Sequence, residues 1–235
     1  MMGDTSKYEY TRGKEVDLKA EQEETLQTPV LPANFILRTM YFTMDVLYGS
    51  KGSLPKFKVI ELLASYPYRA WENGSYNRVS RRYAKARYVK EGVLDKDLRH
   101  IELGRDAQDN EQDHLTMIED IMRQKGMKQG WFRGFLLPRC MIMTYHVLTR
   151  VMYFVKPEWS FSMNARFESH AEHEYMRLVQ DHPEWEDEPV ETVHFERYPR
   201  QKTMADLFRR IGLDERDHMN ESLEEYERLT GKSLT

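Results

Sequence analysis

Apolar residues recur every three or four positions along most of this chain, which is the spacing of one face of an α-helix. The spacing begins at Ala33, glycine and proline fall between the periodic segments, and no alternating strand pattern appears. The pattern therefore predicts an all-α protein. Its expected helices cover residues 33–48, 55–91, 95–126, 130–156, 158–182 and 203–229.

Residues 1–32 and 181–196 lack this pattern. The first stretch is polar, with seven acidic and four basic residues, and we expect a flexible N-terminal arm (1–32) before a single helical domain (33–235). This stretch lacks the apolar segment of a secretory signal peptide, and it is more acidic than a mitochondrial or plastid transit peptide. The second stretch has seven acidic residues and no Lys or Arg, which predicts a solvated loop.

Composition narrows the class of protein. The 235 residues include one cysteine, which excludes an internal disulfide or a cysteine-based zinc site. No uncharged apolar stretch approaches the roughly 18 residues that a membrane-spanning helix needs. The net charge of -4 gives no general attraction to nucleic acid, so we expect no nucleic-acid partner.

Carboxylates occupy helix faces that should be buried. In the third predicted helix, Glu111 and His114 interrupt an otherwise apolar stripe, and the last helix repeats the pattern with Glu215 and His218. The second and fifth predicted helices each add a single carboxylate. The candidate metal ligands are therefore Glu61, Glu111, His114, Glu168, Glu215 and His218. A third Glu-x-x-His pair, Glu191 and His194, falls in the acidic loop, and we assign it to solvent.

Four buried carboxylates would repel one another strongly without cations among them. Glu and His three residues apart on a helix can bind one metal centre, and carboxylate and imidazole suit iron or manganese. Ferritin-like di-iron bundles use this set, with one Glu from each of two helices and Glu-x-x-His from each of the other two. The alternative is a helical bundle whose half-buried Glu side chains pair with Arg or Lys.

Four ordered motifs surround these residues between about Pro55 and Tyr226. They are PKFKVIELLASYPYRAW around Glu61, DNEQDHL around Glu111 and His114, RFESHAEHEYMRL around Glu168, and LFRRIGLDERDH around Glu215 and His218. Together they resemble the alternative oxidase family, which includes the plastid terminal oxidases. The resemblance implies a ferritin-like di-iron four-helix bundle with two additional amphipathic helices, in which the six candidate ligands hold two Fe ions.

The resemblance also implies the reaction and the residues close to the metal ions. A member of this family oxidises a quinol, ubiquinol or plastoquinol, and reduces O₂ to water without pumping protons. Tyr175 would supply an electron or hydrogen atom, although its spacing alone equally fits a core tyrosine. Asn110 and Asp214, each directly before a ligand Glu, would orient the ligands.

A second group of residues is implied for quinol binding. Ile60 and Ala171 match positions that line the quinol pocket, and Lys56 falls where the family usually carries Arg. A lysine offers a point charge rather than a planar fork, which changes how a headgroup could be held. The tryptophan common near the family's last helix has no clear counterpart, because Trp185 lies too early in the chain.

Two segments suggest how a quinol enzyme would reach lipid. Residues 35–48 and 131–155 are apolar on more than one face and carry arginines spaced to reach headgroups, and residues 78–90 add six basic residues and no acid. Together with the family resemblance, these segments predict a monotopic protein on one leaflet of an energy-transducing membrane. The resemblance also implies a homodimer. That membrane is the bacterial inner membrane, or a mitochondrial or plastid membrane if the chain is a mature form. The alternatives are a buried helix and a solvated basic face.

Two other functions stay open at this point. A di-iron hydroxylase of a quinone precursor or lipid would use the same ligands. A metal-binding or structural subunit without turnover would keep the same bundle.

Overall fold

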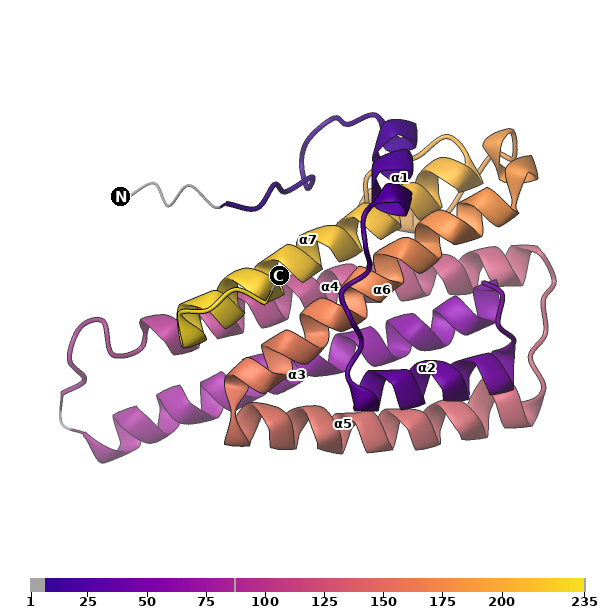
Figure 1. The fold of residues 1–235 in the computed structure, drawn as a ribbon. Coiled ribbons are helices and arrows are strands. Elements are labelled where there is room, and N and C mark those ends of the chain that lie inside the picture. The colour runs from indigo at the N-terminus through magenta and orange to yellow at the C-terminus, as the bar shows by residue number, and fades with distance from the viewer. Residues whose placement is uncertain (1–6, 87, 235) are drawn as a thin grey trace. The chain divides into compact units, whose positions relative to one another are not determined.

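The computed structural model describes residues 7–86 and 88–234, and these residues form helices and no strand (Figure 1). The all-α prediction is confirmed. The α-helices are α1 (Leu18–Gln27), α2 (Phe35–Tyr48), α3 (Leu54–Lys85), α4 (Asp95–Gln124), α5 (Leu137–Val155), α6 (Pro157–Asp181) and α7 (Met204–Thr230). Three short helical turns are η1 (Phe132–Leu136), η2 (Pro183–Glu186) and η3 (Val193–Glu196).

Helix ends follow the capping residues in the sequence. The Asn34 side chain accepts a hydrogen bond from the Leu37 amide at the start of α2, and Thr203 accepts one from the Asp206 amide at the start of α7. Helix α7 stops at Gly231, whose φ of 67° is a left-handed conformation that favours glycine. The six predicted helices are confirmed to within a few residues when η1, which runs directly into α5, is counted with that helix. The largest difference is then the end of α3.

The sequence pattern predicts no helix before residue 33. This prediction is wrong, because α1 lies within residues 1–32. Asp17 caps α1 by accepting from the amides of Lys19 and Ala20. Its two buried residues are Gln22 and Thr25, both polar, so no apolar stripe revealed the helix. The division into an arm and a domain stays a prediction.

The chain forms two compact units, which are described separately. The terminal unit comprises Met1–Lys56 and Phe161–Thr235, and the central unit comprises Phe57–Ser160. The terminal unit holds α1, α2, α7 and nearly all of α6. The central unit holds nearly all of α3, together with α4, η1 and α5.

In the terminal unit, α6 and α7 approach closely at Gly212. A Cβ atom there would lie 3.1 Å from the Tyr175 Cβ and 3.0 Å from the Met176 Cε, so a larger residue would require these neighbours to shift by a few tenths of an ångström. Helix α1 lies against both, since Gln22 donates to the Met176 carbonyl at 2.7 Å and accepts from Arg209 Nε at 2.8 Å.

In the central unit, α3 and α4 approach closely at Gly104. A Cβ atom there would lie 2.7 Å from the Tyr68 carbonyl oxygen. Helix α5 runs along α3 (Figure 1) and is held by Tyr153, whose hydroxyl contacts Ser75 Oγ at 2.8 Å and accepts from Arg78 Nη2 at 2.6 Å. Each unit thus brings a pair of long helices together at a glycine.

The acidic stretch 181–196 is more structured than a solvated loop. It contains η2 and η3, and Trp185, Val190 and Thr192 are buried. Its seven acidic side chains nevertheless lie at least partly exposed. The prediction is therefore right for the charges and wrong for the backbone between them, because Trp185 and Val190 fold inward.

Candidate metal centre

The central unit places three predicted ligands together. Glu61 on α3 and Glu111 and His114 on α4 are each at most 1% exposed. The His114 Nδ1 lies 3.3 Å from Glu61 Oε2 and 4.0 Å from Glu111 Oε2. Their candidate ligand atoms all lie within 4.8 Å of one another. Glu111 and His114 are three residues apart and therefore lie on the same face of α4, which also carries the buried Ala107.

The terminal unit contains a matching set. Glu168 on α6 and Glu215 and His218 on α7 are at most 1% exposed. The His218 Nδ1 lies 3.3 Å from Glu215 Oε2, and the candidate ligand atoms of the three residues lie within 4.8 Å of one another. Each unit therefore holds a buried triplet of two carboxylates and one imidazole.

Both triplets fit a divalent transition-metal ion. Nitrogen and oxygen ligands bind such ions at about 2.1 Å, so two adjacent donors on one ion lie about 3 Å apart. The 3.3 Å separations of His114 from Glu61 and of His218 from Glu215 agree with this value. Carboxylate and imidazole donors suit iron or manganese, and burial would make the carboxylates costly without a cation.

Asp214, directly before Glu215, is held on both of its oxygens. The Tyr198 hydroxyl donates to Oδ2 at 2.5 Å, and Arg210 Nη2 donates to Oδ1 at 2.6 Å. Burial and the neighbouring Asp214 carboxylate raise the pKa of Tyr198 well above its ordinary value, so the hydroxyl keeps its proton. Burial lowers the pKa of Arg210, but Asp214 and Tyr198 outweigh it and raise the pKa.

A second buried carboxylate, Asp217, adjoins the candidate ligand His218. It accepts from the Thr11 amide at 2.8 Å, the Arg12 amide at 2.7 Å and the Thr11 hydroxyl at 3.1 Å. The same hydroxyl accepts from Arg210 Nη2 at 2.8 Å. The N-terminal segment thereby holds the turn of α7 that carries Glu215 and His218.

The residues predicted from the sequence did not include Tyr198, Arg210, Thr11 and Asp217. The four-residue spacing of Arg210 and Asp214 on one helix was a usable signal. Nothing local could reveal Thr11, which contacts a residue 206 positions away.

Tyr175 is fully buried in the terminal unit and belongs to an aromatic stack. Its ring lies 6.0 Å from that of Phe208, which lies 5.0 Å from that of Trp185. Trp185 stacks in turn on His182 at 4.3 Å. The tryptophan therefore lies in the same aromatic column as the candidate redox tyrosine, with Phe208 between them, an arrangement that its position in the sequence did not suggest.

The candidate quinol residues lie on two helices, Lys56 and Ile60 on α3 and Ala171 on α6. Lys56 is 5% exposed, with Nζ 2.7 Å from Asp45 Oδ1 of α2. Ile60 on α3 and Ala171 on α6 are buried, each in its own unit. Asn110 on α4 is half-buried. The roles assigned to these residues, to Tyr175 and to Asp214 stay predictions.

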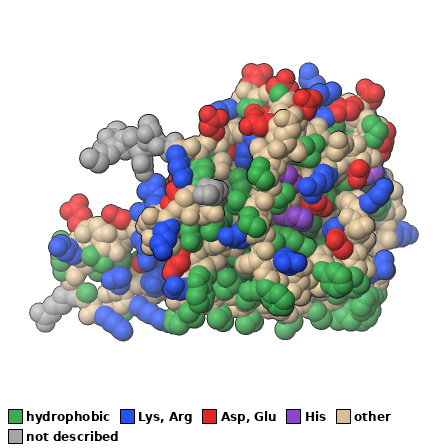
Figure 2. All heavy atoms as spheres, in the orientation of Figure 1, with side chains coloured by type: hydrophobic (Ala, Val, Ile, Leu, Met, Phe, Trp, Pro, Cys, Tyr) green, Lys and Arg blue, Asp and Glu red, His purple; other side chains and the backbone are tan. Residues whose placement is uncertain are grey.

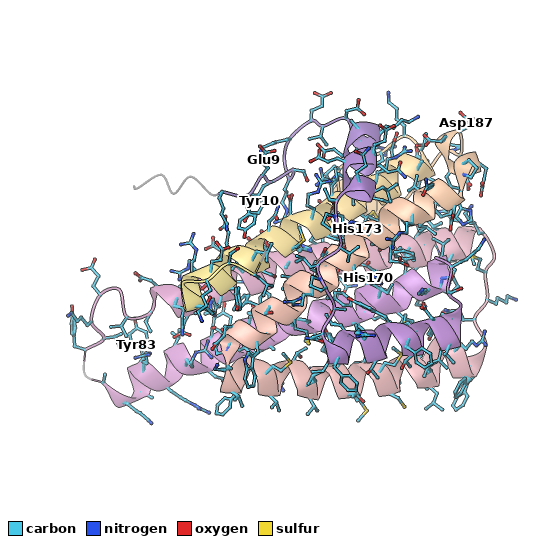
Figure 3. The ribbon with its side chains drawn as sticks, in the orientation of Figure 1. Glu9, Tyr10, Tyr83, His170, His173 and Asp187 are labelled. Atoms are coloured by element: carbon cyan, nitrogen blue, oxygen red, sulfur yellow. The ribbon has the colours of Figure 1, made fainter. Side chains whose placement is uncertain are left out.

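Histidines outside the triplets have other partners. His173 contacts the carbonyl oxygens of Ser169 and Thr28, and His170 stacks on Tyr41 at 3.9 Å; both lie on α6 (Figure 3). The third Glu-x-x-His pair is at the surface, where Glu191 is exposed and forms an ion pair with Arg200 at 2.9 Å.

Long helices that present buried Glu, Glu and His triplets are typical of the di-iron carboxylate class of helical proteins. The sequence profile of the alternative oxidase family matches residues 14–224, nearly the whole chain. This chain belongs to the alternative oxidase family, a family of di-iron oxidoreductases. No curated protein matches it.

Proposed function

We propose that this protein is a quinol:oxygen oxidoreductase that reduces O₂ to water at a non-haem di-iron centre without pumping protons. The observation that carries the proposal is the buried Glu, Glu and His triplet in each unit of a chain that belongs to the alternative oxidase family. The substrate would be ubiquinol or plastoquinol.

The six triplet residues would hold two iron ions, whose four positive charges balance the four carboxylates. When bound, the ions supply the O₂ binding and the electron transfer that this chemistry requires. The protein's part is to fix the ligands and exclude water. Asp214, held by Tyr198 and Arg210, orients the α7 ligand turn. Tyr175, fully buried, would donate an electron and a proton from its hydroxyl.

Quinol would bind beside the ligand helices. Ile60, which adjoins Glu61, and Ala171, which follows Glu168 by three residues, would each take part in quinol binding. Lys56 would provide a positive charge for the headgroup oxygen. Its ion pair with Asp45 limits the motion of the lysine, which cannot make the bidentate contact of arginine.

Membrane attachment is part of the proposal. No helix among the described residues is long and apolar enough to cross a bilayer. Helix α5 of the central unit nevertheless exposes Met143, Val147, Val151, Phe154 and Val155, and Figure 2 shows hydrophobic side chains gathered along its position. In the terminal unit, α2 exposes Phe35, Phe42 and Val46. We propose that these faces enter one leaflet of an energy-transducing membrane and that the protein acts as a homodimer.

Oxygen uptake tests the function. Membranes that contain the protein should consume O₂ when quinol is supplied and cyanide blocks haem oxidases. Glu111→Ala should abolish this uptake and lower the iron content, because it removes a buried ligand. Glu102→Ala is the matched control, since Glu102 lies on the same helix and is exposed.

The products and the metal content separate the rival functions. All oxygen from labelled O₂ should appear in water, and one labelled atom in an organic product would identify a hydroxylase instead. Purified protein without iron, or with iron but without quinol-dependent uptake, would identify a non-catalytic protein. Unchanged uptake in Glu111→Ala would show that the ligand assignment is wrong.

A further inference from the structure

A pocket of about 430 Å³ lies at the C-terminal end of α3 in the central unit. Five cations line it, and the described lining includes no acidic residue. They are Arg78, Arg81, Arg82, Lys85 and Lys90. The remaining walls are mostly apolar, with Val89 and Val93 beside Tyr88.

Arg78 differs from the other four cations, because it is already engaged. Its Nε lies 2.6 Å from the buried Asp97, and its Nη2 donates to Ser75 and Tyr153. Arg81, Arg82, Lys85 and Lys90 are exposed. Basic residues in the last turn of a helix also stabilise its dipole, which accounts for Arg82 and Lys85. It does not account for Lys90, which lies beyond α3 and still lines the pocket.

The pocket lies beside the exposed apolar end of α5. Arg78 lines the pocket and also donates to Tyr153 of α5, and the next two residues, Phe154 and Val155, are 81% and 59% exposed. Tyr83, at the end of α3 in Figure 3, and Tyr88 are exposed as well. Tyrosines are enriched where protein meets the headgroup layer.

We propose that this pocket binds the phosphate group of an anionic phospholipid while the apolar face of α5 enters the leaflet. The inference rests on the membrane attachment proposed above. Arginine and lysine bind phosphate by charge-assisted hydrogen bonds, and the apolar walls at Val89 and Val93 suit the glycerol region of a lipid better than a free ion.

Vesicle binding tests the proposal. The purified iron-loaded protein is mixed with phosphatidylcholine vesicles that contain 0% or about 30% phosphatidic acid or phosphatidylglycerol, and bound protein is separated by flotation. Arg81→Gln/Arg82→Gln/Lys85→Gln should weaken binding to the anionic vesicles by about fivefold for each cation removed. Binding to pure phosphatidylcholine should stay unchanged, because α5 is intact. Arg78 is kept, since it anchors a buried network.

The matched control is Arg197→Gln/Lys202→Gln/Lys232→Gln, which removes the same charge from exposed positions of the terminal unit. An equal loss in the control, or no loss in the test variant, would overturn the site. Free phosphate distinguishes the source of the anion. If about 10 mM inorganic phosphate displaces the protein from anionic vesicles as fully as the triple substitution does, the pocket takes a free anion and the lipid assignment is wrong.

Oxygen uptake with a water-soluble quinol in detergent separates this inference from the proposed function. The triple variant should match the parent protein there. If the parent protein shows no uptake, the proposed oxidase function fails while the vesicle result still decides the lipid site.

Discussion

At the scale of single residues, α7 concentrates charges that are held by defined partners. Arg209 and Arg210 are 3% and 6% exposed, and each forms an ion pair with a carboxylate. Arg209 binds Glu186 of the acidic loop, and Arg210 binds Asp214. Buried ion pairs of this kind fix geometry, because removing one partner leaves an uncompensated charge. Both arginines of this pair are therefore held inside the terminal unit by carboxylates.

Replacing Glu186 should change the response to acid. The hydrogen bond from Arg209 lowers the pKa of Glu186 to about 2, despite an opposing effect of burial. The ion pair therefore stabilises the fold above pH 4.5, and this contribution is lost as pH falls toward 2. Glu186→Gln should be less stable than the parent protein at pH 7 and should lose less stability between pH 4.5 and 2, measured by urea unfolding. Asp187→Asn, an exposed acid of the same loop, is the control and should keep the parent's pH profile.

Thr11→Val should destabilise the protein through Asp217. Valine matches threonine in shape but lacks the hydroxyl that donates to Asp217 and accepts from Arg210. A buried polar group left without such a bond costs about 1–3 kcal/mol, so the free energy of unfolding should fall by that amount. Thr39→Val removes an exposed hydroxyl bonded within its own helix and should have little effect. Equal effects in the two variants would argue against a buried role for Thr11.

At the scale of elements, the sequence predicted long helices better than it predicted the contacts between them. The stripes at α4 and α7 placed Glu111, His114, Glu215 and His218 correctly on buried faces, because helical periodicity is a local property. Helix α1 escaped prediction because it buries polar side chains that tertiary partners satisfy.

Gly104→Ala should separate two ligand-bearing helices. A methyl group would lie 2.7 Å from the Tyr68 carbonyl and 3.0 Å from the Glu72 amide nitrogen, both backbone atoms of α3. Alanine gains about 1 kcal/mol of helix propensity, yet overpacking of this kind typically costs about 1–3 kcal/mol. We expect lower unfolding free energy and weaker iron binding, because α4 carries Glu111 and His114. Gly130→Ala, where a methyl group meets nothing within 4 Å, is the control. A stable, fully iron-loaded Gly104→Ala protein would contradict the close approach.

At the scale of the whole molecule, a limited number of apolar residues is divided between the buried core and exposed helix faces. Hydrophobic residues make up 40% of the chain, and many large ones lie on exposed faces of α2 and α5 rather than in a core. Such exposure favours interaction with lipid or another subunit.

Val147→Ser/Phe154→Ser should weaken membrane association. The two side chains are 61% and 81% exposed on α5, so their loss removes apolar area from the proposed membrane face without opening a cavity. The fraction of protein that sediments with membranes should fall, while the free energy of unfolding in detergent should change little. Val193→Ser, 71% exposed in the acidic loop, should leave sedimentation unchanged. If the double variant still sediments with membranes but no longer forms a dimer, this face of α5 is a subunit interface instead.

The sequence by itself determined the helical class, the six candidate ligands and the family, because periodicity and ordered motifs are local in the chain. The tertiary structure decided which of these residues meet: Glu61 with His114 in one unit, and Glu168 with Glu215 and His218 in the other. It alone revealed Thr11 at Asp217 and Tyr198 at Asp214. Contacts between residues far apart in sequence depend on how helices pack, and no local pattern encodes that packing.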